Sequence, residues 1–194
     1  MIEKVLEKRR KVARNDKEVA KEVEVLDKVK AVLEEGKSAR VLNLTDDEKK
    51  LLRSYQLLST KPIIYVCNVN EEDAANDGVD NAYVAKVREF AANENAEVSI
   101  VSAKIEQEIS ELDTDEEKAD FLEMLGLSES GTDKVIKDSY KTLDLISFLT
   151  TGEMETRAWT IKDGTKAVDA AGKIHTDISR GFIKAEIVLS LIHI

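Results

Sequence analysis

Two polar segments in this sequence each follow an apolar run of strand length, and their residue types suit recognition of a purine base. Asn68 and Glu71 follow the first run, and Ser102, Ala103 and Lys104 follow the second. A side-chain amide presents a donor and an acceptor in one plane, which matches the N7 edge and exocyclic group of a purine. Backbone N–H groups and short polar side chains of the second segment could close a pocket over the base.

Spacing alone does not establish such a site. Asn and Glu are common where a strand enters a loop, so the N-x-x-E pattern by itself favours an ordinary turn with self-capping asparagines. In open α/β sheets, however, ligands bind beyond the carboxyl ends of the strands, and both segments occupy such positions. The two segments together have the layout of the base-recognition motifs of GTPase-like domains, which favours a nucleotide site.

The elements that must position these segments are predicted from hydrophobic periodicity. Apolar runs at 63–69 and 96–104 flank a helical pattern near 81–93, and this order predicts a βαβ unit with parallel strands. The continuous apolar run of the first strand is typical of a parallel strand covered on both faces. Short helices are expected near 115–125 and 132–142, followed by β segments at 146–151, 156–161 and 182–188.

The first 35 residues have the pattern of a solvated helical hairpin. Residues 2–35 contain neither Gly nor Pro, and their Val and Leu residues fall at helical spacing in a narrow seam. Asp16 is suited to cap the second helix, which Gly36 ends. A third helix is predicted after Thr45, because Thr45 and Glu48 have the spacing of a capping box.

The charge pattern restricts nucleic-acid binding to a local contact. A net charge of −10 excludes a protein that coats nucleic acid with its whole surface. The sign reverses at the predicted tip of the hairpin, where Arg9, Arg10, Lys11 and Arg14 cluster. One interpretation is a tip that contacts RNA phosphates, and the commoner alternative is a solvated helix end.

The cysteine and histidine residues offer few candidates for a reactive or ligand-binding site. The single Cys67 excludes a disulfide framework and indicates a reducing, cytoplasmic setting for a soluble protein. No stretch approaches the roughly 18–20 apolar residues of a membrane helix, so no membrane partner is expected. His175 is expected to be a structural or partner-facing loop residue, because the only other histidine is His193 near the end of the chain.

Three long segments resemble the YchF/Obg-like ATPase family, in that family's order: KPIIYVCNVNEED, EVSIVSAKIEQEISEL and RAWTIKDGTKAVDAAGKIHTDISRGFIKAEIV. Together with the basic hairpin, the resemblance covers roughly residues 1–188, and the IHTD segment with its flanking glycines is highly specific. Members of that family bind and hydrolyse ATP in preference to GTP, and they associate with ribosomes. The resemblance therefore implies ATP and the ribosome with its RNA as partners.

The resemblance also implies an α/β fold with three parts. Residues 1–58 would form a helical coiled-coil insertion, and 59–143 would form the C-terminal part of the nucleotide-binding, OBG-type G domain with its parallel strands. Residues 144–188 would form a partial TGS domain of β-grasp fold. The last residues, 189–194, read LSLIHI, fit neither the family nor a strand end, and are expected to be a non-native tail.

Within the first polar segment, the resemblance places Asn68 on the purine edge and the Val69 backbone against adenine, with the second segment as the opposite wall. GTPases carry N-K-x-D, whose aspartate accepts hydrogen bonds from N1–H and the N2 amino group of guanine. Here Glu71 is one methylene longer, and Val69 replaces the lysine. Adenine has neither donor, so a carboxylate placed for guanine would lose its solvent without gaining a partner.

The sequence departs from the family where phosphate is bound. No G-x-x-x-x-G-K-S/T motif occurs in the 194 residues, and DGTK at 163–166 lacks its spacing. We therefore expect the phosphate cradle and Mg²⁺ ligands to lie upstream of Met1, the chain to be a fragment, and this fragment to be catalytically inactive. Its parent would be a monomeric ATP hydrolase. The alternative function is a ribosome or RNA interaction module, hairpin plus TGS, that acts without nucleotide.

Overall fold

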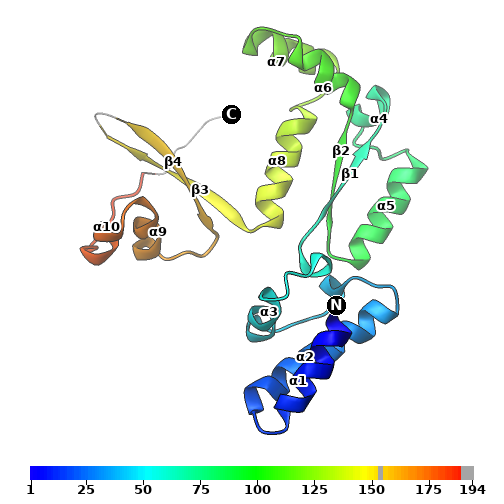
Figure 1. The fold of residues 1–194 in the computed structure, drawn as a ribbon. Helices are drawn as coiled ribbons and strands as arrows, with labels where there is room; N and C mark the ends of the chain where they lie inside the picture. Colours follow the sequence, from blue (N-terminus) through cyan, green and yellow to red (C-terminus); the bar gives the residue numbers. More distant parts are fainter. Residues whose placement is uncertain (153–154, 189–194) are drawn as a thin grey trace. The chain divides into compact units, whose positions relative to one another are not determined.

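The computed structural model describes residues 1–152 and 155–188, and the expected tail at 189–194 lies outside the described residues. The chain divides into two compact units, Met1–Asp138 and Ser139–Ile194 (Figure 1). The first unit contains both polar segments and the basic hairpin.

The first unit begins with a pair of packed helices, α1 (Ile2–Ala13) and α2 (Lys17–Glu34). The Asp16 carboxylate begins α2 by accepting hydrogen bonds from the backbone N–H groups of Glu18 and Val19, at 2.9 and 3.3 Å. Leu6, from α1, and Leu26, from α2, are buried in the seam between them. The predicted helical hairpin is therefore confirmed.

The base of the hairpin is closed by short elements. These are η1 (Ala39–Val41), α3 (Asp46–Arg53) and η2 (Leu58–Thr60). The capping box predicted at the start of α3 is present: Thr45 N–H donates to Glu48 Oε2 at 2.8 Å, and Glu48 N–H donates to Thr45 Oγ1 at 3.3 Å. The pKa of Glu48 falls to about 2, because Lys28 donates a hydrogen bond to its carboxylate and Thr45 adds two more.

A parallel strand pair forms the centre of the unit. β1 (Ile64–Asn68) pairs with β2 (Glu97–Val101) in a register that sets Asn68 opposite Val101. The connection contains α4 (Glu71–Ala75) and α5 (Ala82–Asn93), and this arrangement confirms the predicted βαβ unit. Three helices follow the second strand: α6 (Ala103–Ser110), α7 (Asp115–Met124) and α8 (Gly131–Thr142).

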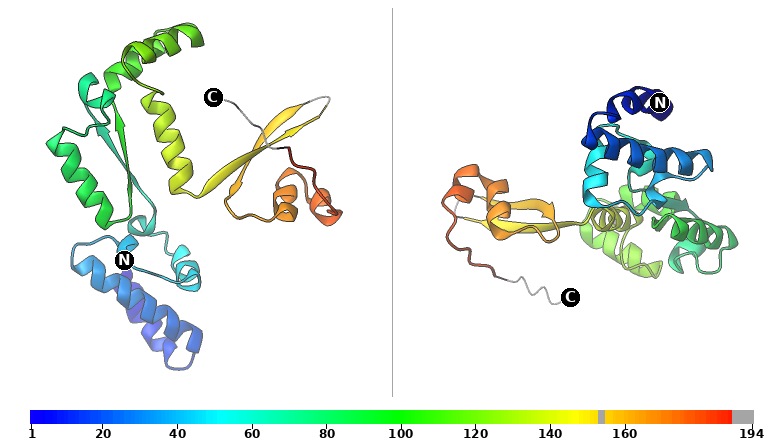
Figure 2. Two further views of the ribbon diagram at one scale, coloured as in Figure 1. Left: turned by 180° about the vertical axis from the view of Figure 1, so that it is seen from behind. Right: turned by 90° about the horizontal axis from the view of Figure 1, so that it is seen from below.

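Helices lie on both faces of the strand pair (Figures 1 and 2). On one face, Phe90 of α5 meets Tyr65 edge to face, with 5.9 Å between ring centroids. On the other face, the hydroxyl of the fully buried Ser99 is hydrogen-bonded to Asp138 of α8. The expected coverage of β1 on both faces is wrong at Val66, which is 51% exposed because the described residues place no side chain over it.

The second unit is built on an antiparallel pair. β3 (Leu145–Thr151) pairs with β4 (Thr156–Lys162). Two helices follow, α9 (Ala167–Ile174) and α10 (Thr176–Arg180), and neither was expected from the sequence. Among the described residues of this unit, the buried apolar side chains are Ile161 of β4 and Ala171 of α9. The Ala-rich segment at 167–171 favours the helix α9, because alanine has the highest helix propensity.

The strand predicted at 182–188 is wrong: this segment has no regular secondary structure. Ile183 and Val188 are 92% and 87% exposed. A strand requires a neighbouring edge to satisfy its backbone N–H and C=O groups, and no described strand pairs with this segment. Its apolar residues indicate strand propensity, but propensity alone does not supply a pairing edge.

Candidate functional site: a pocket at the carboxyl ends of two parallel strands

The two polar segments come together at the carboxyl edge of the strand pair, because Asn68 and Val101 end β1 and β2 side by side. They line an open pocket of about 480 Å³, within the size range of small-molecule sites. The structure thus brings together all six residues that the sequence assigned to a base site. The lining residues are Asn68, Val69, Asn70, Glu71, Glu72, Ser102, Ala103 and Lys104.

Asn68 connects the two segments. Its side-chain Oδ1 accepts a hydrogen bond from the backbone N–H of Ala103 at 3.0 Å. Because Ala103 N–H is a donor, it fixes which end of the amide is the oxygen. The amide nitrogen of Asn68 has no partner among the described residues and retains two donor hydrogens. The neighbouring Val69 N–H donates to the carbonyl of Val101 at 2.9 Å, so the start of this loop is held against β2.

Glu71 and Lys104 form a second connection across the pocket. Lys104 Nζ is paired with Glu71 Oε1, which links the first residue of α4 to the start of α6. This hydrogen bond and the charge of Glu71 raise the pKa of Lys104, and the charge of Glu108, 3.9 Å away, adds to the effect. Both side chains remain accessible, with 39% of Glu71 and 69% of Lys104 exposed.

Asn70, between these two contacts, has a local role. Its side chain accepts a hydrogen bond from the backbone N–H of Asp73 at 2.7 Å and so caps α4. The interpretation of this segment as a self-capping turn therefore describes Asn70. It does not describe Asn68, whose oxygen reaches the other segment.

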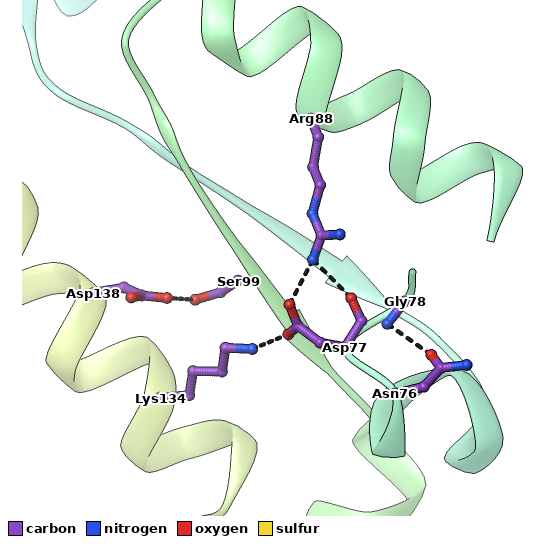
Figure 3. Close-up of polar contacts among 7 residues, drawn as sticks. All are labelled: Asn76, Asp77, Gly78, Arg88, Ser99, Lys134 and Asp138. Atoms are coloured by element: carbon purple, nitrogen blue, oxygen red, sulfur yellow. Dashed lines mark hydrogen bonds and ion pairs between the residues drawn. The ribbon is translucent and has the colours of Figure 1, made fainter. Parts of the chain in front are cut away.

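The loop after α4 is anchored to helices on both sides of the sheet (Figure 3). Asp77 has a positive φ of 57°, and its carboxylate lies between Arg88 of α5, at 2.6 Å, and Lys134 of α8. Within the loop, Gly78 N–H donates to Asn76 Oδ1 at 3.0 Å. Sequence reasoning missed this anchor, because residues so far apart give no local signal that they meet.

A buried carboxylate connects η1, at the base of the hairpin, to the other end of the strands. Glu94, at the end of α5, accepts hydrogen bonds from Ser38 Oγ at 2.6 Å, Tyr65 Oη at 2.8 Å and Arg40 at 2.9 Å. Its side chain is only 9% exposed. The hydrogen bond from Ser38, followed by those from Tyr65 and Arg40, holds the pKa of Glu94 below its usual value.

The basic residues of the hairpin do not form one group. Arg9 pairs with Glu22 at 3.3 Å, and Arg10 pairs with Asp27 at 2.7 Å, so both side chains are engaged with α2. Lys11 and Arg14 have no ion-pair partner among the described residues.

The remaining candidates have structural roles or show no sign of reactivity. His175 Nδ1 accepts a hydrogen bond from Asp177 N–H at 3.2 Å and so caps α10. Burial raises the pKa of the Cys67 thiol, which makes it less reactive. Among residues 1–152 and 155–188, no cluster of His, Cys, Asp and Glu could hold a metal ion. No described helix has the length and apolar character needed to cross a membrane.

Comparison with known proteins identifies the family. Residues 145–190 match the family model YchF-GTPase_C, described as "Protein of unknown function (DUF933)". The "Ribosome-binding ATPase YchF" of Bacillus subtilis (strain 168) is 50% identical over 188 residues, which cover 96% of this chain and 51% of that protein. The chain belongs to the YchF family.

Other YchF proteins agree with this assignment. The "Ribosome-binding ATPase YchF" of Escherichia coli O157:H7 is 43% identical over 92% of this chain and 48% of its own length. The solved structure of the Schizosaccharomyces pombe YchF GTPase matches with a TM-score of 0.79 and 31% identity, over 94% of this chain and 50% of that one. The chain spans about half the length of the curated YchF relatives it matches.

The match to the yeast YchF structure supports the mixed α/β fold with a parallel strand pair and flanking helices. The names of these relatives differ in the nucleotide: the bacterial YchF proteins are called ATPases, and the yeast protein is called a GTPase. Both names describe a nucleoside triphosphatase, and both belong to proteins about twice as long as this chain.

Proposed function

We propose that this chain is the base-recognising part of a ribosome-associated ATPase that binds ATP in preference to GTP. The observation that carries this proposal is the pocket between the two polar segments, with Asn68 held by Ala103 so that its amide nitrogen remains a free donor. Such a donor suits N7 of a purine. Val69 offers its backbone to the face of adenine, and residues 102–104 form the opposite wall.

The phosphate side of the reaction is proposed to lie in sequence outside these 194 residues. The relatives are about twice as long as this chain, and no phosphate-binding P-loop motif occurs within it. Residues of the longer protein would hold the triphosphate and Mg²⁺, which neutralises charge that develops during phosphoryl transfer. The parent protein is proposed to be a monomer in the cytoplasm.

The helical part at the start of the chain and the β-rich part at its end are proposed to contact the ribosome. In this proposal residues 1–58 are a coiled-coil insertion, 59–143 belong to the nucleotide-binding domain and 144–188 to a TGS domain. Lys11 and Arg14, whose charges have no described ion-pair partner, are the residues best able to contact ribosomal RNA phosphates. The same observation favours the second candidate function, a ribosome-binding module that acts without nucleotide.

The proposal is tested by removing the free amide. In the longer protein, Asn68→Ala is expected to weaken ATP binding by about 1–3 kcal/mol, because a buried polar partner on the base is left unpaired. Isothermal titration with ATP measures this change. Asn93→Ala is the matched control, since within the described part of the chain the side chain of Asn93 bonds to the Glu89 carbonyl of its own helix. An unchanged dissociation constant would make the first polar segment an ordinary turn and favour the second candidate function.

A separate preparation, of the chain by itself, tests catalysis. The 194-residue chain alone is expected to hydrolyse no ATP above background, because contacts to the base do not stabilise charge at the transferred phosphoryl group. The expectation would be contradicted if a preparation free of contaminating ATPases hydrolysed ATP and if Asn68→Ala abolished that turnover.

A further inference from the structure

The sequence contains two Asp–Gly pairs, Asp77–Gly78 and Asp163–Gly164. In such a pair the glycine nitrogen can attack the aspartate side chain, because glycine has no Cβ to hinder the approach. Both pairs are therefore candidates by sequence. Their surroundings in the fold differ at the two groups that react, the side-chain carboxyl and the backbone nitrogen.

At Asp77–Gly78 both of these groups are held in other contacts (Figure 3). The Asp77 carboxylate lies between Arg88, at 2.6 Å, and the ammonium group of Lys134. The Gly78 nitrogen donates to the main-chain carbonyl of Asp73 at 2.6 Å. Attack by this nitrogen on its neighbouring side chain would break these contacts, so the fold protects the first pair.

At Asp163–Gly164 the two groups lie together. The Gly164 N–H donates to Oδ1 of Asp163 at 2.8 Å, so the nitrogen is next to the carboxyl carbon that it would attack. Asp163 is exposed and has no ion-pair partner within residues 1–152 and 155–188. Its carboxyl is therefore free to react.

The space around the two glycines differs in the same sense. A Cβ placed on Gly164 would meet no atom within 4 Å, whereas one placed on Gly78 would lie 3.1 Å from the side chain of Val84. Gly164 is exposed and Gly78 is buried. A five-membered ring can form at the second pair without displacing a neighbour.

We propose that Asp163 is a site of spontaneous isomerisation to isoaspartate. The Gly164 nitrogen bonds to Cγ of the protonated Asp163 side chain and loses its proton, and the side-chain hydroxyl leaves as water. A water molecule then opens the ring at the main-chain carbonyl carbon of Asp163. The peptide bond is thereby transferred to the side-chain carboxyl carbon, an α-carboxylate is released, and the mass of the chain is unchanged.

The product would alter the turn between β4 and α9. Thr165 closes this turn, because its N–H and its Oγ1 donate to the Lys162 carbonyl at 3.1 and 2.6 Å. Isoaspartate lengthens the main chain by one methylene within the turn. The released α-carboxylate makes the site a substrate for a carboxyl methyltransferase of the class that uses S-adenosylmethionine to methylate isoaspartate. The nucleotide site has no part in this chemistry.

The experiment compares the two pairs in one molecule. The 194-residue chain is incubated for several weeks in mildly acidic buffer, with and without guanidinium chloride, and peptide mapping by mass spectrometry locates isoaspartate. In the folded chain, residue 163 is expected to exceed residue 77 by roughly tenfold, because near-attack orientation changes rates by at least this factor. In guanidinium chloride the two pairs should react at similar rates, since their residues are identical.

Three variants separate the site from its surroundings. Asp163→Glu is expected to lose most of the methyl groups that an isoaspartyl methyltransferase adds to the aged chain, because glutamate would have to close a six-membered ring. Asp169→Glu is the matched control: this exposed aspartate of the same unit precedes alanine, and the variant should keep the wild-type level. Arg88→Met is expected to raise isoaspartate at Asp77 and to leave residue 163 unchanged, because it removes one partner of the Asp77 carboxylate.

Each outcome supports the proposal or overturns it. An excess at residue 163 that disappears in guanidinium chloride supports it. Equal amounts at the two pairs in buffer, or none at residue 163, would overturn it. Methyl incorporation that is undiminished in Asp163→Glu would place the modification elsewhere, and an excess that persists in guanidinium chloride would show that the fold does not select the site.

Discussion

Glu94 is a carboxylate whose protonation is linked to folding. Its three hydrogen bonds lower its pKa in the folded chain below the value of about 4.3 expected in the unfolded chain. A group with a depressed pKa contributes stability above the unfolded pKa and loses it as pH falls through the folded pKa. The junction between hairpin and strands is therefore expected to weaken in acid below about pH 4.

Replacing this carboxylate tests that linkage. Glu94→Gln is expected to lower the free energy of unfolding at pH 7 by about 3 kcal/mol, because Arg40 loses its buried partner. In urea titrations the difference from wild type should shrink as pH falls through the lowered pKa of Glu94, because the wild-type carboxylate becomes protonated there. Glu89→Gln, on the exposed side of the same helix, should match wild type. A difference that stays constant with pH would show that Glu94 acts only by packing.

At the scale of an element, the hairpin has two kinds of basic residue. Arg9 and Arg10 engage α2, whereas Lys11 and Arg14 near the tip have no such partner in the described structure. The 18 residues of α2 span about 27 Å at 1.5 Å per residue. This length exceeds the screening length of about 8 Å at physiological ionic strength, so charges at the tip should not influence a nucleotide at the strands.

A ribosome-binding assay tests the tip. Replacing Arg9, Arg10, Lys11 and Arg14 with glutamine in the longer protein is expected to weaken co-sedimentation with ribosomes and to reduce its salt dependence, because fewer counterions are released. ATP affinity should stay near wild type. The pair Lys11→Gln and Arg14→Gln should account for most of the loss.

The charge-matched control for that pair is Lys49→Gln with Lys50→Gln, since both lysines pair with aspartates within α3. A quadruple variant that sediments like wild type at every salt concentration would make the tip a solvated helix end. The ribosome contact would then be sought in residues 144–188.

At the scale of the whole molecule, each described sheet has two strands and leaves apolar side chains exposed. In the first unit, Val66, Tyr83 and Phe90 are 51%, 79% and 56% exposed. In the second, Leu149 and Ile183 are 68% and 92% exposed. Strand pairs of this size are marginally stable, and open edges with apolar neighbours favour association.

The isolated chain is therefore expected to unfold over a broad temperature range and to associate as its concentration rises. The hairpin, which contributes five buried apolar residues to the core cluster that it forms with η1 and α3, should be its most persistent element. Circular dichroism melting and sedimentation velocity measure the two properties. A sharp, reversible, two-state transition of a monomer would contradict this expectation.

Sequence alone determined the features that depend on neighbouring residues. Asp16 and Thr45 cap their helices through hydrogen bonds to residues two or three positions away, so the pattern contains both partners. Both strands beside the pocket and the helix between them follow from periodicity. The resemblance carried by the three long segments predicted the family, and the ends of two parallel strands predicted that the polar segments would meet.

Tertiary structure decided the contacts between residues that are distant in sequence. The pairing of Arg10 with Asp27, the Asp77 anchor and the Glu94 network all depend on how the elements pack, and no short pattern contains both partners. The same reason explains the failed strand at 182–188, because a strand requires an edge that its own residues cannot supply. Sequence placed Lys104 in the wall of the pocket, but only the fold showed that its charge is directed at Glu71.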